Sequence, residues 1–285
     1  MNTATVTYLR GVRFSNAALP KIWPFSVDNY ISKGLRFAVQ PQHNAGSMKD
    51  LSGNGMAFTQ IGEEVSFTKQ GVICRGALGM FKTDSVETLS YTGVVVFRLH
   101  RIAETWQNSG VLALSCYGAL TSHLPTPISA GGGTIGYAVG YEDVSDSYIL
   151  HRAATGTFNP ETGNFGTASL NIGNEIPRFA HAAPSSSWVF AMGGVDSDAQ
   201  THWAVTRNIY MNFQTSSPQP VHTRFTAYDP IGWALGGPGR QYSAWSAMRV
   251  EIACAAVWDR PLSTTEQQLQ YENTRALCQT RGILI

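Results

Sequence analysis

The clearest structural signal in the chain lies in residues 249–285, which read RVEIACAAVWDRPLSTTEQQLQYENTRALCQTRGILI. Residues 248–257 form an apolar run of β-branched and small side chains, which is typical of a buried strand. Pro261 ends that pattern. Ser263 and Glu266 then have the spacing of a capping box, in which the serine oxygen and the glutamate carboxylate each accept the other residue's backbone N–H.

A short helix is predicted to follow the capping box. Residues 264–277 contain no Gly or Pro and are rich in Glu, Gln, Leu and Ala, which favour the helix. Leu262 is expected to bury its side chain where this helix meets the rest of the protein. Leu269, Ala276 and Leu277 recur at helical spacing, so they are predicted to continue that contact along one face.

The composition favours sheets joined by turns. The chain has 285 residues, of which only 14% are charged and 28 are glycine, and its net charge is +1. That charge gives no reason to expect a nucleic-acid partner. No apolar run approaches the roughly 20 residues that cross a bilayer, and the N-terminus does not resemble a signal peptide. We therefore expect a soluble protein made in a cytoplasm, with neither nucleic acid nor membrane as partner.

Short β-like runs separated by turn residues succeed one another from residue 35 onwards. The predicted strands cover 35–39, 56–61, 65–68, 71–75, 91–100, 111–117, 134–141, 147–152, 168–172, 188–192, 202–210, 221–227, 231–235 and 248–257. Helices do not alternate with these runs, which argues against a parallel sheet. The pattern predicts an antiparallel sandwich or jelly roll.

The first 34 residues differ from the rest of the chain, because two prolines interrupt them and they lack periodicity. We interpret residues 1–34 as an N-terminal arm. Its apolar side chains are candidates for an assembly contact: Phe14, Leu19, Ile22, Trp23 and Phe25. Such an apolar segment should not remain in water, so it either packs on its own domain or docks on a neighbour. The sequence leaves both possibilities open.

Three phrases resemble concanavalin A-like (laminin G-like) jelly-roll domains. Residues 257–263, VWDRPLS, stand where that family has its closing motif, and residues 50–55, DLSGNG, resemble its opening loop. Residues 188–196 and 201–205 resemble its central hairpin. The resemblance implies an all-β antiparallel sandwich over residues 35–285, with an extended N-terminal arm over 1–34 and a short C-terminal helix.

The ending with Arg281, Gly282 and Ile283 is most similar to bacteriophage virion proteins. This resemblance implies a non-catalytic structural protein of the tail or baseplate, located in a virion assembled in the host cytoplasm. It would act in multiple copies through contacts with other virion proteins. The alternative function is a glycan-binding adhesion module that recognises host surface polysaccharide. A glycoside hydrolase of the same fold is the third class.

The carboxylates do not show the pattern that a hydrolase of this fold needs, which is several acidic residues at alternating positions of one strand. Glu63 and Glu64 are adjacent, so on a strand they would point to opposite faces, and Glu251 stands alone on its strand. We therefore predict no enzyme activity, no catalytic residues and no cofactor.

No metal site is predicted either. No two of the seven histidines have the spacing of a metal-binding pair. Four turn residues have side chains that could bind calcium: Asp50, Asn54, Asp196 and Asp198. The favoured interpretation is that these side chains hydrogen-bond their own backbone in turns.

Aromatic and polar residues in the loops provide the candidate contacts to a ligand or partner: Trp106, Arg240, Gln241, Tyr242 and Trp245. A flat ring beside hydrogen-bond donors suits a sugar, and the same residue types anchor protein interfaces. The alternative is that these rings only cap one end of the sandwich. Four other tryptophans fall in strand patterns and are predicted to be core: Trp188, Trp203, Trp233 and Trp258.

The four cysteines are predicted to be buried free thiols: Cys74, Cys116, Cys254 and Cys278. They lie far apart in the sequence, and disulfides rarely persist in a cytoplasm. Thiol counting on the denatured protein should find four free groups. A mass spectrum that contains a bridged pair of cysteine peptides would contradict this prediction.

Overall fold

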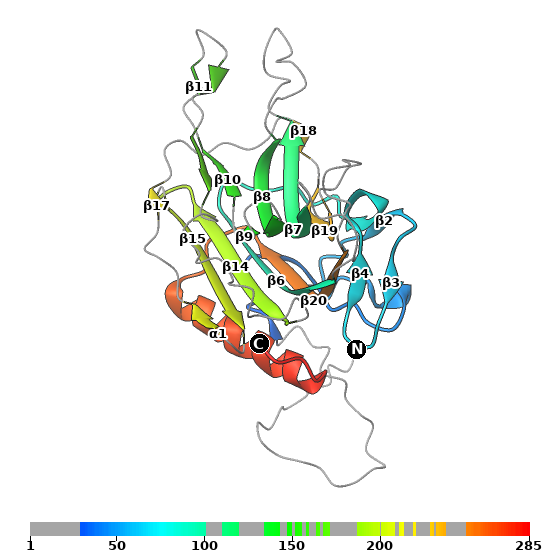
Figure 1. Ribbon diagram of the computed structural model, residues 1–285. Coiled ribbons are helices and arrows are strands. Elements are labelled where there is room, and N and C mark those ends of the chain that lie inside the picture. Colours follow the sequence, from blue (N-terminus) through cyan, green and yellow to red (C-terminus); the bar gives the residue numbers. More distant parts are fainter. Residues whose placement is uncertain are drawn as a thin grey trace, which may run out of the picture.

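The computed structural model describes most of the chain after residue 28. The described residues are 29–100, 110–119, 134–142, 147–149, 152–155, 158–159, 164–165, 168–171, 187–199, 201–208, 211–213, 219–220, 229–230, 232–237 and 249–285. Within them the strands form two main antiparallel sheets, and one α-helix, α1 (Thr264–Thr280), lies along the outside of one sheet (Figure 1). The predicted all-β sandwich with a short C-terminal helix is confirmed.

The larger sheet contains nine strands among the described residues: β1 (Leu35–Val39), β3 (Ser66–Phe67), β4 (Val72–Cys74), β6 (Tyr91–His100), β14 (Val189–Asp196), β15 (Thr201–Asn208), β16 (Met211–Phe213), β17 (Gln219–Pro220) and β20 (Arg249–Trp258). Its main order is β16-β15-β14-β6-β20-β4-β3. β20 pairs with β6 on one edge and with both β1 and β4 on the other. It is therefore the central strand of this sheet.

The second sheet contains seven strands among the described residues: β2 (Thr59–Gly62), β5 (Gly79–Lys82), β7 (Gly110–Ala119), β8 (Thr134–Glu142), β9 (Ser147–Ile149), β18 (Asp229–Pro230) and β19 (Ala234–Leu235). Two separate strand pairs complete the described strands. β10 (Arg152–Thr155) pairs with β13 (Ala168–Asn171), and β11 (Phe158–Asn159) pairs with β12 (Asn164–Phe165). In Figure 1, β7 and β8 stand above the layer that β6 and β20 form.

The side chains of β20 are buried on both faces of the larger sheet, which explains why its sequence is almost continuously apolar. Val250, Ile252 and Val257 enter the core between the two sheets. Cys254 and Trp258 enter a second core, which α1 covers. The sheet is thus a middle layer, with the other sheet on one side and the helix on the opposite side.

The capping box that starts α1 is present as predicted. The Ser263 side chain accepts the N–H of Glu266, and the Glu266 carboxylate accepts the N–H of Ser263 at 2.9 Å. The helix continues to Thr280, three residues beyond the predicted end. Its buried face consists of Gln270, Tyr271, Thr274, Leu277 and Cys278.

The predicted apolar face of α1 is only partly correct. Leu277 is buried, but Leu269 is 48% exposed and Ala276 is also exposed. The prediction chose residues by hydrophobicity alone. The helix instead turns Gln270 and Thr274 inward, because these polar side chains hydrogen-bond each other at 3.1 Å and Gln270 also bonds the backbone of residues 29 and 31.

The turn between β20 and α1 is fixed by several hydrogen bonds. The Thr92 hydroxyl on β6 donates to the Arg260 carbonyl and accepts the N–H of Leu262. The Arg260 guanidinium contacts the Glu266 carboxylate at 2.6 and 2.9 Å. This contact lowers the pKa of Glu266 to about 2, so its carboxylate stays ionised and keeps the cap intact over the ordinary pH range.

The loop at residues 50–55 is held by turn chemistry. The Asp50 carboxylate accepts the N–H groups of Ala38, Ser52 and Met56. The Asn54 amide nitrogen donates to the carbonyls of residues 35 and 36. Likewise, Asp196 accepts two N–H groups from its own turn. Asp50, Asn54 and Asp196 thus make the backbone hydrogen bonds that the favoured interpretation of the sequence predicts.

The structure agrees with most predicted strands that fall in its described part. β1 and β6 have the predicted bounds, and β14 pairs with β15 as the predicted central hairpin. The prediction for 221–227 lies outside the described residues, and β5 was not predicted. The four tryptophans predicted to be core and all four cysteines are buried.

The end of the predicted N-terminal arm packs on the sandwich. Tyr30 is buried against Trp258, and the Trp258 indole N–H donates to the Ile31 carbonyl at 2.7 Å. Residues 1–28, which include the candidate assembly side chains Phe14, Leu19, Ile22, Trp23 and Phe25, lie outside the described residues.

Leu262 tests how the helix is attached to the sheet. Its side chain is buried in the core beneath α1, so Leu262→Ala should lower the free energy of unfolding by about 2–5 kcal/mol. Ser263→Ala should cost only about 1 kcal/mol, the usual value of an N-cap. Leu284→Ala is the control at a leucine that is 58% exposed and should change stability by less than about 0.5 kcal/mol. Urea denaturation measures all three variants; equal costs at Leu262 and Leu284 would contradict the observed packing.

Candidate functional site

A buried carboxylate lies at one end of β20, on the sheet face that α1 covers farther along. The side chain of Glu251 has no exposed surface. Its oxygens contact three side chains, with the Thr68 hydroxyl at 2.5 Å, Arg98 Nε at 2.6 Å and His100 Nε2 at 2.8 Å. Arg98 lies directly opposite Glu251 on β6, and Thr68 follows β3. Two strands, β20 and β6, and the residue that follows β3 therefore meet at one carboxylate.

Glu251 orients two side chains that reach solvent. Arg98 is one-quarter exposed and His100 is one-third exposed. The guanidinium of Arg98 also lies over the Trp188 ring, 4.6 Å from its centroid. Because Glu251 occupies Arg98 Nε and His100 Nε2, the terminal nitrogens of Arg98 and the Nδ1 of His100 have no hydrogen-bond partner among the described residues. The geometry thus presents polar groups in fixed positions at the protein surface.

The pKa of Glu251 is lower than usual. Burial alone would raise the pKa of this carboxyl, but the hydrogen bonds from His100, Thr68 and Arg98, together with the positive charge of Arg98, outweigh that effect. The carboxylate therefore stays ionised and keeps its hold on Arg98 at neutral pH.

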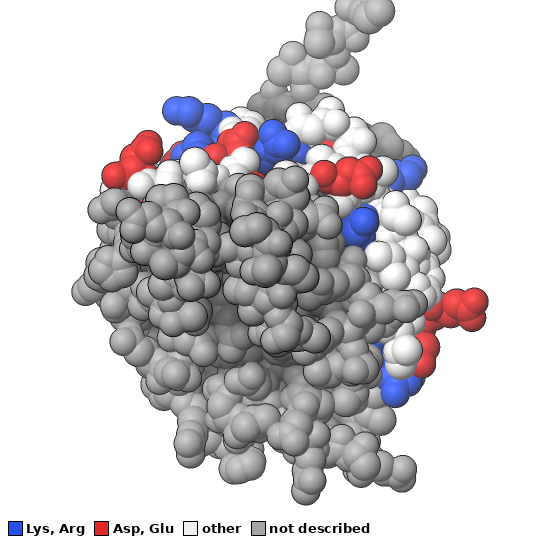
Figure 2. Space-filling model, turned by 90° about the horizontal axis from the view of Figure 1, so that it is seen from above, with Lys and Arg blue, Asp and Glu red and all other residues white. Residues whose placement is uncertain are grey.

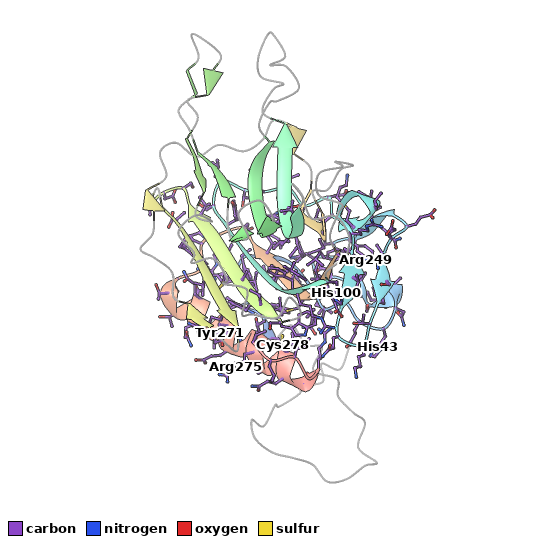
Figure 3. All side chains as sticks on the ribbon, in the orientation of Figure 1. His43, His100, Arg249, Tyr271, Arg275 and Cys278 are labelled. Atoms are coloured by element: carbon purple, nitrogen blue, oxygen red, sulfur yellow. The ribbon has the colours of Figure 1, made fainter. Side chains whose placement is uncertain are left out.

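A second group of charges lies beside this site. Arg249, at the start of β20, pairs with His100 at the end of β6. Arg249 and Arg75 both contact the exposed Glu64 carboxylate, at 3.5 and 2.6 Å. Figure 3 shows His100 and Arg249 at the same end of the sheet, away from Tyr271 and Cys278 on α1. We call Arg98, His100, Glu251 and Arg249 the β6–β20 end site.

The sequence-predicted contact residues lie outside the described residues: Trp106, Arg240, Gln241, Tyr242 and Trp245. In the sequence, Trp106 is six residues after His100, and Trp245 is four residues before Arg249.

The β6–β20 end site does not have the composition of a glycosidase centre or a metal centre. Its buried carboxylate contacts a guanidinium, an imidazole and a hydroxyl, and no second carboxylate among the described residues hydrogen-bonds with these groups. No group of three or more potential metal ligands occurs in the described part of the chain. What the site offers is hydrogen-bonding to the oxygens of a ligand.

Another buried polar cluster lies between α1 and the sheet. Cys254 and Cys278 hydrogen-bond to each other, and Tyr30 also contacts Cys254. Burial raises the pKa of Tyr30 well above its usual value, so its hydroxyl remains protonated. Arg281 donates to the carbonyls of Ala253 at 2.7 Å and of residue 41 at 2.8 Å. Because this cluster is enclosed, we assign it to the attachment of the helix.

The sequence prediction missed the β6–β20 end site. Glu251 was noted only as an isolated carboxylate, and Arg98 and His100 were not selected. One signal could have revealed them. Arg98 and His100 alternate on a strand that is otherwise apolar, and Glu251 interrupts the apolar run of the central strand. Polar residues on the same face of two buried strands indicate that the strands pair there.

Among the described residues at the rim of the face seen in Figure 2, acidic and basic side chains are interspersed. No helix among the described residues is long and apolar enough to span a membrane. These findings agree with the balanced composition of the chain.

Comparison with known proteins shows the fold. No protein-family model matches the chain, and no curated protein matches it. The ligand-binding domain of botulinum neurotoxin serotype D, solved in complex with N-acetylneuraminic acid, matches with a TM-score of 0.52 and 9% identity over 85% of this chain and 51% of that chain. A Trypanosoma rangeli sialidase, solved in complex with sialic acid, matches with a TM-score of 0.51 and 12% identity over 86% of this chain and 34% of that chain.

The chain thus spans about half the length of the toxin domain and one-third of the sialidase chain. At these identities the matches show a shared β-sandwich architecture and nothing of a site.

Glu251→Gln tests the electrostatics of the β6–β20 end site. The substitution keeps the size of the side chain but leaves Arg98 partly buried without its counter-charge, so the free energy of unfolding should fall by about 2–4 kcal/mol at pH 7. Because the folded-state pKa of Glu251 is lowered, the ionised carboxylate stabilises the fold above the unfolded pKa of about 4.3, and this contribution is lost as the pH falls through the lower folded value.

The difference between wild type and Glu251→Gln should therefore shrink in urea melts below about pH 4. Glu64→Gln is the matched control, because Glu64 also contacts an arginine but is exposed, and its cost should be smaller. A difference that does not depend on pH would contradict the assigned ion pair.

Proposed function

We propose that this protein is a non-catalytic carbohydrate-binding module of concanavalin A-like jelly-roll type. Its ligand is a glycan of a cell surface, and the β6–β20 end site forms part of the binding surface. The observation that carries the proposal is that the buried Glu251 carboxylate holds two partly exposed side chains, Arg98 and His100, at one end of the sandwich.

The chemistry of sugars fits these groups. Sugar hydroxyls and carboxylates offer many oxygens, and proteins bind them with a few polar groups held in fixed positions. A guanidinium that is already stacked on a ring and bonded to a carboxylate loses little conformational entropy when it binds. The Arg98 guanidinium already covers the Trp188 ring. The rings that would pack on a sugar face are therefore those predicted from the sequence, Trp106, Tyr242 and Trp245.

The comparisons support this class of ligand without placing a site. The toxin domain and the sialidase named above were both solved with a sialic acid. That two proteins of similar fold were solved with a sugar supports a glycan as the class of ligand.

The virion assignment rests on the sequence resemblance alone. A tail or baseplate component could itself carry a glycan-binding module, so a location in a virion and the proposed ligand are compatible. A purely structural role predicts that no glycan binds, which separates it from our proposal.

A glycan array that includes sialylated and neutral oligosaccharides, followed by calorimetry on the best ligand, tests the proposal. His100→Ala and Trp245→Ala should each weaken binding by about tenfold or more, equivalent to about 1.4 kcal/mol. Arg36→Ala is the control, because Arg36 is exposed on β1 and makes only a 3.8 Å ion pair with Asp259. Either the absence of any glycan ligand or equal affinities for all variants would overturn the proposed function.

A further inference from the structure

Two thiols meet in the enclosed core between α1 and the larger sheet. Cys254 lies on the central strand β20, and Cys278 lies in the last turn of α1, two residues before the helix ends at Thr280. Their side chains hydrogen-bond to each other, and both residues are fully buried in the same core. Two cysteines of different elements whose sulfurs are already in contact need only a small movement to form a disulfide.

The polar groups around Cys254 favour its charged form. The hydrogen bond with Cys278 lowers the pKa of Cys254. The positive charge of Arg281 and a hydrogen bond with Tyr30 act in the same direction, and together these effects outweigh burial. The side-chain hydrogen bonds of Arg281 among the described residues all go to backbone carbonyls, so a thiolate supplies a counter-charge that these neutral groups lack.

Cys74 shows what burial alone does to a thiol in this protein. It is also fully buried, and burial raises its pKa to about 12. A thiol with such a pKa stays protonated at neutral pH, whereas oxidants react with the thiolate. Cys254 is therefore the more reactive of these two buried cysteines, and Cys278 lies beside it in a position to react with its oxidised sulfur.

We propose that Cys254 and Cys278 are an oxidative modification site, at which a hydroperoxide converts the two thiols into a disulfide between β20 and α1. A small oxidant suits the site because both sulfurs are enclosed, so the end of the helix has to open only locally to admit it. The bond forms only on exposure to the oxidant, so protein kept under reducing conditions retains its four free thiols.

The reaction consumes one molecule of hydrogen peroxide for each pair of thiols. The Cys254 thiolate attacks one peroxide oxygen, the O–O bond breaks, and the sulfur becomes a sulfenic acid. The hydroxide that leaves takes up the proton that Cys254 had lost and becomes water. The Cys278 sulfur then attacks the Cys254 sulfur, the S–O bond breaks, and the departing hydroxide leaves with the Cys278 proton as a second water. The two thiols together lose two electrons, and the peroxide gains them.

The disulfide fastens the last turn of α1 to the central strand. In the reduced protein this turn is held by packing and hydrogen bonds alone, such as those that Arg281 donates to the carbonyls of Ala253 and residue 41. A covalent bond between residues 254 and 278 closes a loop in the chain and restricts the unfolded state. Oxidation should therefore make the end of the helix harder to open.

The test uses the full-length protein, freed of reductant and treated with hydrogen peroxide until glutathione in a parallel sample is fully oxidised. After denaturation and alkylation, wild type should carry two alkylated thiols instead of four. Trypsin separates the two cysteines, so the bridge should join peptide 250–275 to peptide 276–281. Cys278→Ala should instead retain a sulfenic acid on Cys254 that dimedone traps. Cys74→Ala is the matched control and should form the same bridge as wild type.

Hydrogen exchange shows whether the bond fastens the helix. The amides in the last turn of α1 should exchange more slowly in oxidised wild type than in the same protein reduced with dithiothreitol, by about tenfold or more. Peroxide-treated Cys278→Ala should show no such slowing. Four free thiols after the treatment, a bridge that involves Cys74 or Cys116, or unchanged exchange in the bridged protein would each overturn the proposal.

Discussion

The structure depends on keeping both faces of β20 away from water. This strand has partners on both edges, a second sheet against one face and α1 against the other, and its side chains from Val250 to Trp258 are all buried. A helix in a protein owes most of its stability to the packing of its buried face, so sheet and helix each need the other. Thr92 and the Arg260–Glu266 pair hold the turn that makes this mutual coverage geometrically possible.

Local signals in the sequence were sufficient for the elements that local chemistry determines. The capping box at Ser263 and the strand from Tyr91 to His100 were predicted because neighbouring residues alone decide them. The buried face of α1 was mispredicted. Burial of Gln270 depends on the backbone of Asn29 and Ile31, which are more than 230 residues away in sequence, and hydrophobicity cannot anticipate that partner.

The β6–β20 end site shows the same limit for function. Glu251 is a solitary acid in the sequence. It becomes a structured centre only because the fold brings Thr68, just after β3, and Arg98, on β6, to it from 183 and 153 residues away. Residue types that attract attention in a sequence are clustered ones, such as the aromatic residues near residue 242. A single carboxylate that organises neighbouring strands leaves no such cluster, so pairing register is the information that was missing.

In the pairing of β1 with β20, Leu35 lies opposite Trp258. The central strand β20 can therefore pair with β1 only after nearly the whole domain has left the ribosome. Contacts of such long sequence separation make folding slow, because chain entropy is lost before the pairing compensates for it. During synthesis β6 is exposed on the edge where β20 will later insert, and its valine-rich sequence is the kind that associates with other strands. Recovery of native protein during expression should therefore be sensitive to translation rate, temperature and chaperone supply, even though the finished fold is well packed.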